Sequence, residues 1–447
     1  MKRGWGIAIA ATAVLTACAV WSSPDRSLVL QPVVLCEDAG WCWFQDERAL
    51  VLDDDTVVFG SVANGRGDAS RKGDVQITQW QLSSGEARTC ELFDRFERDD
   101  HDAPALWLRP DGRVVAAFAG HGKDDLLHVR VSERPRDATS FLPLVSTRIA
   151  MQRGRGVTYA NLHELGGALV CLSRAEDWNP TVLVASDHDG RDFRNAGRLL
   201  AGEGRPYVKY ASRAGTLHFV VTEQHPRDFD NGLYHGTTDG TGDVCASTGE
   251  VLGSWGTVGP QQCTRVFAGG PDAVAWPCDL ELDAAGRPVV VFSVQVDGRD
   301  VPRGQGGLDH RYWYARFDGQ RFVAHEIAFA GTRLYAGEDD YTGLVCMCPD
   351  DPDVVFLSTD AHPATGTPLV SAADGRRHRE LFVGRTRDSG ATFLWEAVTR
   401  DSTVDNLRPI VPRWRSDRCA LLWLRGVLRT YTDYDLEAVG AIVSLRR

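Results

Sequence analysis

Residues 99–122, Asp-Asp-His-Asp-Ala-Pro-Ala-Leu-Trp-Leu-Arg-Pro-Asp-Gly-Arg-Val-Val-Ala-Ala-Phe-Ala-Gly-His-Gly, contain two short apolar runs separated by an Asp-Gly turn. This pattern predicts two antiparallel β-strands joined at Asp111-Gly112. His101 lies ten residues before Asp111, and His121 lies ten residues after it. Because residues equidistant from such a turn lie opposite each other, we expect the two imidazoles to meet at the open end of the hairpin. The pair suits acid–base chemistry or substrate binding, although two exposed histidines would have the same spacing.

The same strand–turn–strand unit occurs seven times along the chain. The copies are Ala49–Val62, Ala105–Gly120, Asn161–Arg174, Tyr210–Glu223, Leu280–Val294, Leu344–Thr359 and Pro412–Gly426. Successive turns lie between 48 residues (167 to 215) and 71 residues (215 to 286) apart. That spacing leaves room for four short strands and their loops in each unit. The sequence therefore predicts an all-β fold, a seven-bladed β-propeller.

Two further features fit such a ring. Thr386–Phe393 matches the Asp-box pattern S/T-x-D-x-G-x-T-W/F, a turn between the outer strands of a blade, and Ser186–Phe193 is a degraded copy. We expect the Asp-boxes to be structural, without a chemical role. Pairing of an N-terminal strand in Leu28–Leu35 with the C-terminal strand Val439–Leu445 would close the ring and cover both sheet edges.

The composition restricts the class of partner. The chain has 447 residues with 45 glycines, a formal net charge of −12 and a pI near 5.5. An acidic protein is a poor ligand for nucleic acid or for an anionic membrane surface. A local cationic site in such a protein still accommodates an anionic substrate.

Residues 1–17 have the pattern of an export signal. Lys2 and Arg3 precede the apolar stretch Ile7–Leu15, which is too short to span a bilayer as a stable helix. The sequence therefore predicts a protein that is exported from a bacterial cell.

The end of this signal, Leu15-Thr16-Ala17-Cys18, resembles a bacterial lipobox. In that interpretation Cys18 is lipidated, residues 18–27 form a tether, and residues 28–447 form the propeller. We expect a lipoprotein of the periplasm or cell surface that contacts the membrane only through its lipid anchor. The alternative is an ordinary cleaved signal with a coincidental cysteine.

Ten cysteines remain after Cys18 is set aside. Export permits disulfides, but the sequence does not assign a pairing. Cys346 and Cys348 alternate along an expected strand and face the same side. Together with Cys278 or His310 they are candidates for a structural metal, zinc, although the spacing is not that of a CxxC site. We leave the metal unassigned.

Three neighbouring repeats carry reactive side chains at equivalent hairpin ends. These are His101 and His121 in the second repeat, Tyr159 and Arg174 in the third, and Tyr207 and His225 in the fourth. Lys209, which belongs to the same motif as Tyr207, is counted with the substrate-binding candidates. Each tyrosine alone is also a common strand aromatic, and each charged residue a common strand end. Their matched positions on adjacent blades favour a shared site.

Histidine, tyrosine and arginine together suit β-elimination from a uronic acid. That reaction removes the proton beside a carboxylate and expels the 4-linked oxygen. A cation must neutralise the carboxylate in the transition state, and the planar fork of an arginine such as Arg174 pairs with it bidentately. A base and an acid complete the reaction, each typically contributing about 10²–10⁴ in rate.

Most of the chain from Gly40 to Tyr434 resembles the bacterial BNR-4 repeat proteins, which include seven-bladed ulvan lyases and relatives that cleave rhamnosyl-glucuronate linkages. The motifs that carry the resemblance are Asp100–Pro104, Gly120–Gly122, Arg205–Tyr210, Asp309–Tyr314, Asp340–Leu344 and Asn406–Pro412. The motifs in the last two of these regions are typical of uncharacterised members of the family. The resemblance thus implies the fold more strongly than the substrate.

The resemblance also implies roles for the candidate residues. In lyases of this group a histidine and a tyrosine share the acid and base roles, which would fall here on His101 and Tyr159. His121 would lie beside them, and Arg174 would neutralise the carboxylate. The same comparison places Tyr207 and His225 at the substrate.

We therefore expect an exported β-propeller with BNR and Asp-box-type blades that cleaves an acidic, ulvan-like polysaccharide or oligosaccharide by β-elimination. No cofactor is expected to be required for the chemistry. One alternative is a propeller glycoside hydrolase, rhamnosidase-like, with a catalytic histidine. Another is a surface glycan-binding lipoprotein without turnover. A sialidase fits less well, because no arginine triad with a Tyr/Glu nucleophile is evident.

Overall fold

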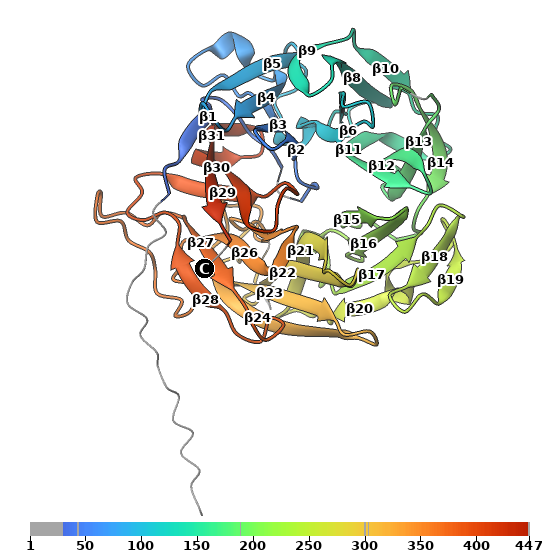
Figure 1. Ribbon diagram of the computed structural model, residues 1–447. Coiled ribbons are helices and arrows are strands. Elements are labelled where there is room, and N and C mark those ends of the chain that lie inside the picture. The colour runs from blue at the N-terminus through green and yellow to red at the C-terminus, as the bar shows by residue number, and fades with distance from the viewer. Residues whose placement is uncertain (1–29, 43, 188, 299–300, 303, 446–447) are drawn as a thin grey trace, which may run out of the picture.

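The computed structural model describes residues 30–42, 44–187, 189–298, 301–302 and 304–445. The expected signal peptide (residues 1–17) and the expected tether with Cys18 (residues 18–27) lie outside these residues. Within them the chain forms seven antiparallel sheets arranged in a ring around a central axis (Figure 1). This is the seven-bladed β-propeller that the repeats predict.

Each blade is one sheet whose strands mainly follow the chain order. The first three blades contain β2 (Ala49–Asp53), β3 (Thr56–Val62), β4 (Val75–Gln81) and β5 (Ala87–Phe93); β6 (Ala105–Leu108), β7 (Val114–Phe118), β8 (Leu126–Arg134), β9 (Asp137–Phe141) and β10 (Val145–Arg148); and β11 (Gly154–Leu165), β12 (Ala168–Glu176), β13 (Pro180–Ala185) and β14 (Phe193–Arg198). In blade two, β9 and β10 both pair with β8.

The remaining blades complete the ring. They contain β15 (Val208–Arg213), β16 (Thr216–Val221), β17 (Leu233–Thr238), β18 (Asp243–Ala246), β19 (Val251–Ser254) and β20 (Thr264–Phe267); β21 (Val274–Leu282), β22 (Pro288–Gln295), β23 (His310–Phe317) and β24 (Phe322–Gly331); β25 (Val345–Cys348), β26 (Asp351–Thr359), β27 (Glu380–Arg385) and β28 (Leu394–Ala397); and β29 (Asp405–Ile410), β30 (Arg418–Thr430), β31 (Asp433–Ser444) and β1 (Val33–Cys36). The exceptions to the chain order are β1, which joins the last blade, and β9 and β20, which pair with β8 and β17 off the main strand order. Four 3₁₀ turns lie in loops: η1 (Ala69–Arg71), η2 (Asp100–Asp102), η3 (Pro226–Asp228) and η4 (Pro260–Gln262).

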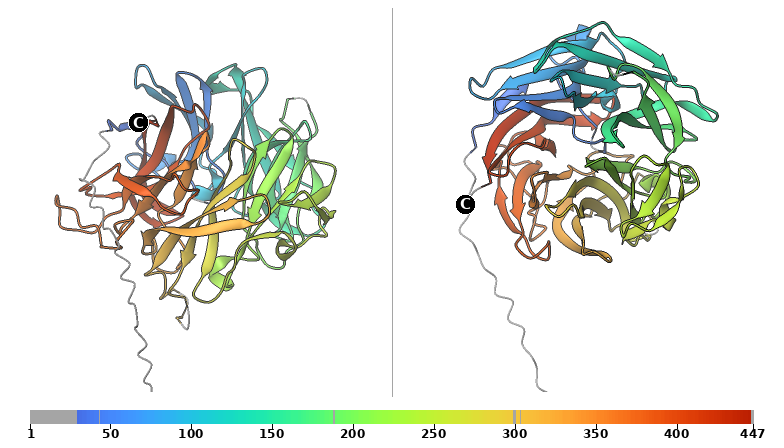
Figure 2. Two further views of the ribbon diagram at one scale, coloured as in Figure 1. Left: turned by 60° about the horizontal axis from the view of Figure 1, so that its bottom comes forward. Right: turned by 45° about the vertical axis from the view of Figure 1, so that its right-hand side comes forward.

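The ring closes by pairing the two ends of the described chain. β1 forms the outer strand of blade seven, with Val33 opposite Gly440 and Val34 opposite Val439. Figure 2 shows the N-terminal strand beside the C-terminal blade. The predicted closure is therefore present, with the N-terminal strand confined to Val33–Cys36.

Strand alternation explains why the blades pack against one another on both faces. In β7, Val114 and Phe118 enter the cluster shared with blade one, whereas Val115 and Ala117 enter the cluster shared with blade three. Successive side chains of a strand point to opposite faces, so one apolar run supplies both interfaces. Seven such clusters occupy the seven interfaces between neighbouring blades.

The seventh hairpin differs from its prediction. The second strand begins at Arg418 as the turn at Ser416-Asp417 implies, but the first strand is β29, which ends at Ile410. Pro412 therefore belongs to the connecting loop and not to the hairpin ladder. A proline lacks the N–H that a ladder needs, and Arg408 at φ 52° interrupts the pairing just before.

The segment Phe44–Arg48 lies inside the ring. The Phe44 ring packs against residues of four blades, among them His101 at 5.4 Å and Trp276 at 6.0 Å between ring centroids. Arg48 donates from Nη2 to the Ala160 carbonyl at 2.7 Å. Within the described residues, no helix has the length and apolar character needed to cross a membrane.

Candidate functional site

The loop before β6 positions His101 through contacts on both sides of η2. Asp99 caps this turn by accepting the His101 N–H at 3.0 Å. The Asp100 N–H donates to the Tyr431 carbonyl at 3.0 Å, and the Asp100 carboxylate forms a fully buried ion pair with Arg408 of blade seven. The loop that carries His101 in blade two is thereby held against blade seven.

His101 and His121 meet as the hairpin spacing predicts. Their rings stack with centroids 3.9 Å apart and an interplanar angle of 15°. Asp99 joins them: one carboxylate oxygen bonds Nδ1 of His101, and the other lies 2.9 Å from Nδ1 of His121. One carboxylate thus serves both imidazoles.

The two histidines have opposite electrostatic environments. Burial alone would lower the pKa of His101, but the adjacent Asp99 carboxylate raises it well above the usual value. Burial and the positive charge of His101 lower the pKa of His121, and the opposing effect of Asp99 is smaller. The His121 side chain is 27% exposed whereas that of His101 is 2% exposed, so the pair opens to solvent at His121.

Tyr159 is directed at this pair by a bulge in β11. The strand gains one residue between Thr158 and Asn161 relative to β12, and Tyr159 has a φ of 62°. A bulge re-aims a side chain, and a positive φ at a bulky residue marks a constrained backbone. The Tyr159 hydroxyl lies 3.2 Å from Nε2 of His121. Burial raises the pKa of Tyr159 well above its usual value, which keeps the phenol protonated.

Arg174 lies between two tyrosine rings. Its guanidinium carbon is 4.6 Å from the Tyr159 ring centroid and 4.2 Å from that of Tyr207. Nη1 donates to the Tyr159 hydroxyl at 3.4 Å, and Nη2 donates to the Pro206 carbonyl at 3.3 Å. Among the described residues, no carboxylate lies within ion-pair distance of this guanidinium. A buried cation of this kind ordinarily has an anionic partner.

The fourth blade contributes two further expected residues. The Tyr207 and His225 rings meet edge to face at 5.0 Å, and both contact the ring of Trp276. Nδ1 of His225 accepts the Arg227 N–H at 3.1 Å and caps η3.

Lys209 is not part of this cluster. Its ammonium is buried and donates to the backbone carbonyl of Gln45. Burial raises the pKa of Asp279, and the positive charge of Lys209 partly opposes that rise. The structure thus brings together His101, His121, Tyr159, Arg174, Tyr207 and His225, and leaves Lys209 outside.

Sequence reasoning missed three residues of the site. Asp99 precedes the quoted histidine by two positions and was visible as a possible imidazole partner. Phe44 meets Tyr159 and Tyr207 edge to face at 4.6 and 4.7 Å, and Tyr431 meets His101 at 5.1 Å. Neither aromatic had a sequence signal, because both reach the site only after the ring closes.

Potential metal ligands occur in four clusters of the described chain. These are Cys42, Asp100 and His101; Asp99, His101 and His121; Glu47, Asp279 and Glu281; and Asp74, Glu91 and Asp94. In the two clusters that contain His101, the carboxylates of Asp99 and Asp100 already pair with His121 and Arg408. These side chains therefore fit an acid–base network better than a metal site. Neither Cys346 nor Cys348 belongs to any of these described clusters.

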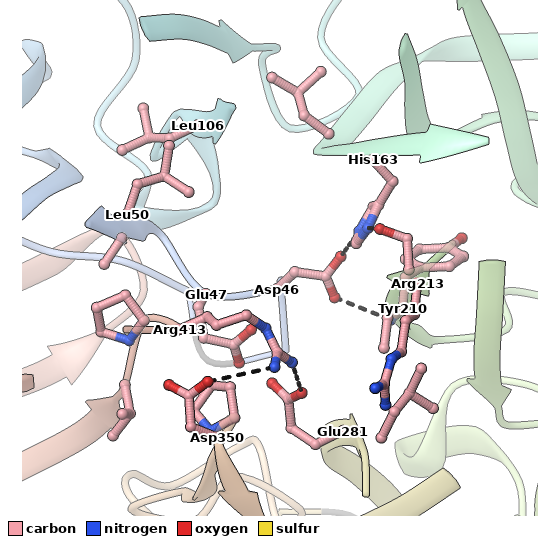
Figure 3. Close-up of a pocket in the computed structure, with 18 of the residues that line it drawn as sticks. Asp46, Glu47, Leu50, Leu106, His163, Tyr210, Arg213, Glu281, Asp350 and Arg413 are labelled. Carbon is pink, nitrogen blue, oxygen red and sulfur yellow. Dashed lines mark hydrogen bonds and ion pairs between the residues drawn. The ribbon is translucent and has the colours of Figure 1, made fainter. Parts of the chain in front are cut away.

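A cavity of about 560 Å³ is lined by residues that include Asp46, His163, Glu281 and Arg413. Figure 3 shows its charged lining. His163 bonds Asp46 through Nε2 at 2.8 Å, and Nδ1 lies 3.2 Å from the Ser212 hydroxyl. Arg413 reaches Glu281 at 2.8 Å and Asp350 at 3.6 Å. These contacts tie residues of several blades together around the cavity.

Comparison with protein families gives one match. The model of a BNR repeat-containing family member matches residues 67–330, more than half of the 447-residue chain. A search of curated proteins finds no match.

Solved structures of similar shape were also found. Two are of a polysaccharide lyase, ulvan lyase, one of them bound to -[GlcA(1-4)Rha3S]-. They have TM-scores of 0.63 and 0.64, are 14% identical, and cover 93% of this chain and 98% of their own. The alpha-L-arabinofuranosidase of Fusarium graminearum, bound to arabinobiose, is 12% identical with a TM-score of 0.42, covering 94% of this chain and 98% of its own. At these identities the likeness to the lyase structures establishes the fold.

Proposed function

The chain belongs to the BNR repeat-containing family, and on that premise we propose that it is a polysaccharide lyase that cleaves a uronic acid-containing glycan by β-elimination. The ulvan lyase structure with a glucuronate-containing ligand has the same fold and supports an acidic glycan as substrate. The assignment of the reaction to this chain depends on its own site.

One observation carries the proposal: Arg174 is a buried residue, 5% exposed, and no carboxylate of the described chain pairs with its guanidinium. It lies beside the Tyr159 hydroxyl, which in turn contacts His121. A uronate carboxylate bound by Arg174 would place the adjacent C5–H next to these two groups. Stabilisation of the developing charge by such a preorganised cation is commonly the largest catalytic contribution.

His121 and Tyr159 transfer the protons. The neutral His121 takes the C5 proton and the protonated Tyr159 phenol delivers its proton to the 4-linked oxygen, so that the C5–H and C4–O bonds break and a C4=C5 double bond forms. Exchange along their 3.2 Å contact restores the starting protonation. His121 is more exposed than His101 and neutral, and therefore suits direct contact with the substrate better than the buried His101, the residue that the resemblance implied.

The experiment is to incubate the purified protein with ulvan and with other glucuronate-containing glycans. Elimination produces an unsaturated uronate with a new ultraviolet absorbance, and we expect Arg174→Met to lower that rate by roughly 10²–10³. Arg109→Met serves as control, because Arg109 pairs with Asp111 and Asp189 at the surface. New reducing ends without the absorbance would indicate a glycoside hydrolase, and binding without cleavage a glycan-binding protein. Either result would refute the lyase.

We also propose export of the protein and its anchoring through lipidated Cys18. The support is the charged and apolar pattern of residues 1–17 and the lipobox-like Leu15–Cys18. An acidic polysaccharide is too large to enter a cell readily, so an exported location fits the proposed substrate.

A further inference from the structure

We propose that Asp99 is the positioning residue that confines one positive charge to the histidine pair, holding His101 as imidazolium and His121 as neutral imidazole. The role in catalysis rests on the proposed function, but the charge distribution itself does not. Neither the family match nor the candidate residues derived from the sequence assign a role to Asp99.

The geometry of the stack requires such an arrangement. With ring centroids 3.9 Å apart, two imidazolium ions would repel each other strongly in a buried site. Two neutral rings would leave the buried Asp99 carboxylate without a counter-ion. A single proton shared with Asp99 avoids both penalties, because the carboxylate reaches Nδ1 of both rings.

The surrounding charges decide which ring carries that proton. His101 faces Asp99, and Asp100 at 3.1 Å. Its other titratable neighbours are the neutral or weakly acidic groups Cys42, Asp102, Tyr159, Tyr335, Tyr341 and Tyr431, and burial raises the pKa of Asp102 and of these tyrosines. The Asp100 carboxylate is also paired with Arg408, so Asp99 is the stronger influence. Anionic groups therefore gather around the buried ring.

His121 has the opposite surroundings. It faces the His101 ring and lies close enough to Arg174 for that cation to disfavour its charged form. Its remaining polar and aromatic neighbours are Asp99, the Tyr159 hydroxyl and the Tyr431 ring, and its backbone N–H donates to Glu97 at 3.2 Å. The proton consequently resides on His101.

The same contact selects a tautomer. With Nδ1–H of His121 donating to Asp99, the lone pair of His121 lies on Nε2, where the Tyr159 hydroxyl is 3.2 Å away. Loss of Asp99 would free His121 to place its proton on Nε2 instead. The proton-exchange contact with Tyr159 would then lose its acceptor.

The test follows the imidazole proton and nitrogen chemical shifts as a function of pH in wild type and Asp99→Asn. His101→Gln and His121→Gln assign the two signals, and Asp111→Asn, in the hairpin turn at the far end of the same blade, is the control. We expect one ring of wild type to be charged and the other neutral, Nδ1-protonated, at pH 7. In Asp99→Asn both rings should be neutral at that pH, whereas Asp111→Asn should match wild type. Unchanged titrations in Asp99→Asn would overturn the proposal.

Kinetics supply a second arm. We expect Asp99→Asn to lower kcat by about 10²-fold or more with KM nearly unchanged, and to shift the acidic limb of the pH profile. Asp99→Glu retains the charge, so it should restore the charged His101 signal even where Asp99→Asn proves unstable by circular dichroism; failure to do so would contradict the proposal. If the wild-type protein shows no lyase activity, the proposed function is refuted, but the imidazole chemical shifts still decide the role of Asp99.

Discussion

Replacement of Arg408 by methionine should lower the unfolding free energy of the propeller by more than the loss of a surface ion pair does. The Arg408 and Asp100 side chains are both 0% exposed, and Arg408 also donates to the Trp41 carbonyl. Methionine fills much of the same volume but removes the guanidinium, so the buried Asp100 carboxylate keeps only the His101 ring, at 3.1 Å, as a cationic neighbour. Breaking a buried pair in this way costs about 3–5 kcal/mol of unfolding free energy.

The assay is urea unfolding followed by tryptophan fluorescence, with Arg88→Met as matched control. Arg88 pairs with Glu86 at 2.9 Å, but the two side chains are 68% and 57% exposed. Such a surface pair contributes about 0–1 kcal/mol. Replacing both buried partners, Asp100→Leu with Arg408→Met, should recover much of the loss, because no unpaired charge remains. Equal destabilisation by Arg408→Met and Arg88→Met would refute this reasoning.

Three other results are expected. Gly60→Ala should lower the unfolding free energy by about 1–3 kcal/mol and reduce activity, because a Cβ there would lie 2.7 Å from the Pro104 carbonyl oxygen, next to the histidine loop. Gly270→Ala is the control, because a Cβ at that position meets no atom within 4 Å. Equal urea midpoints for the two variants would contradict the prediction. The pKa of His101 is raised in the folded protein, so the charged His101 stabilises the fold fully below about pH 6.5 and progressively less as the pH rises through the raised pKa. The difference in unfolding free energy between wild type and His101→Gln should therefore become smaller with rising pH, and a growing difference would be contrary evidence. Cys18→Ser should abolish incorporation of a labelled fatty acid and membrane association; retained label would exclude the anchor.

Much of the fold was accessible from the sequence because the propeller repeats a local pattern. The Asp111-Gly112 turn defined one hairpin, and its spacing placed His101 and His121 together, which the structure confirms. The exception was Pro412, where the seventh hairpin is widened by a loop. That loop depends on the irregular backbone at Arg408, for which local sequence carries no signal.

The site was predictable only in part. Matched repeat positions brought Tyr159 and Arg174 to the histidines, but the orientation of Tyr159 depends on a bulge and a positive φ that propensities do not indicate. Lys209 lies apart from the cluster because its ammonium donates to the Gln45 carbonyl of the segment inside the ring, a contact that the sequence motif does not indicate. Tyr431 could not be foreseen, since blade seven meets blade two only across the closed ring.

Elimination breaks the linkage without adding water, and mass spectrometry of the products formed in heavy-oxygen water tests this. Elimination predicts fragments whose masses sum to that of the intact glycan, with no heavy oxygen incorporated and with an unsaturated uronate at the new end. This product should vanish in Arg174→Met and persist in Arg109→Met. One heavy oxygen per cleaved linkage, in fragments heavier than the substrate by one water, would contradict the account and identify a hydrolase.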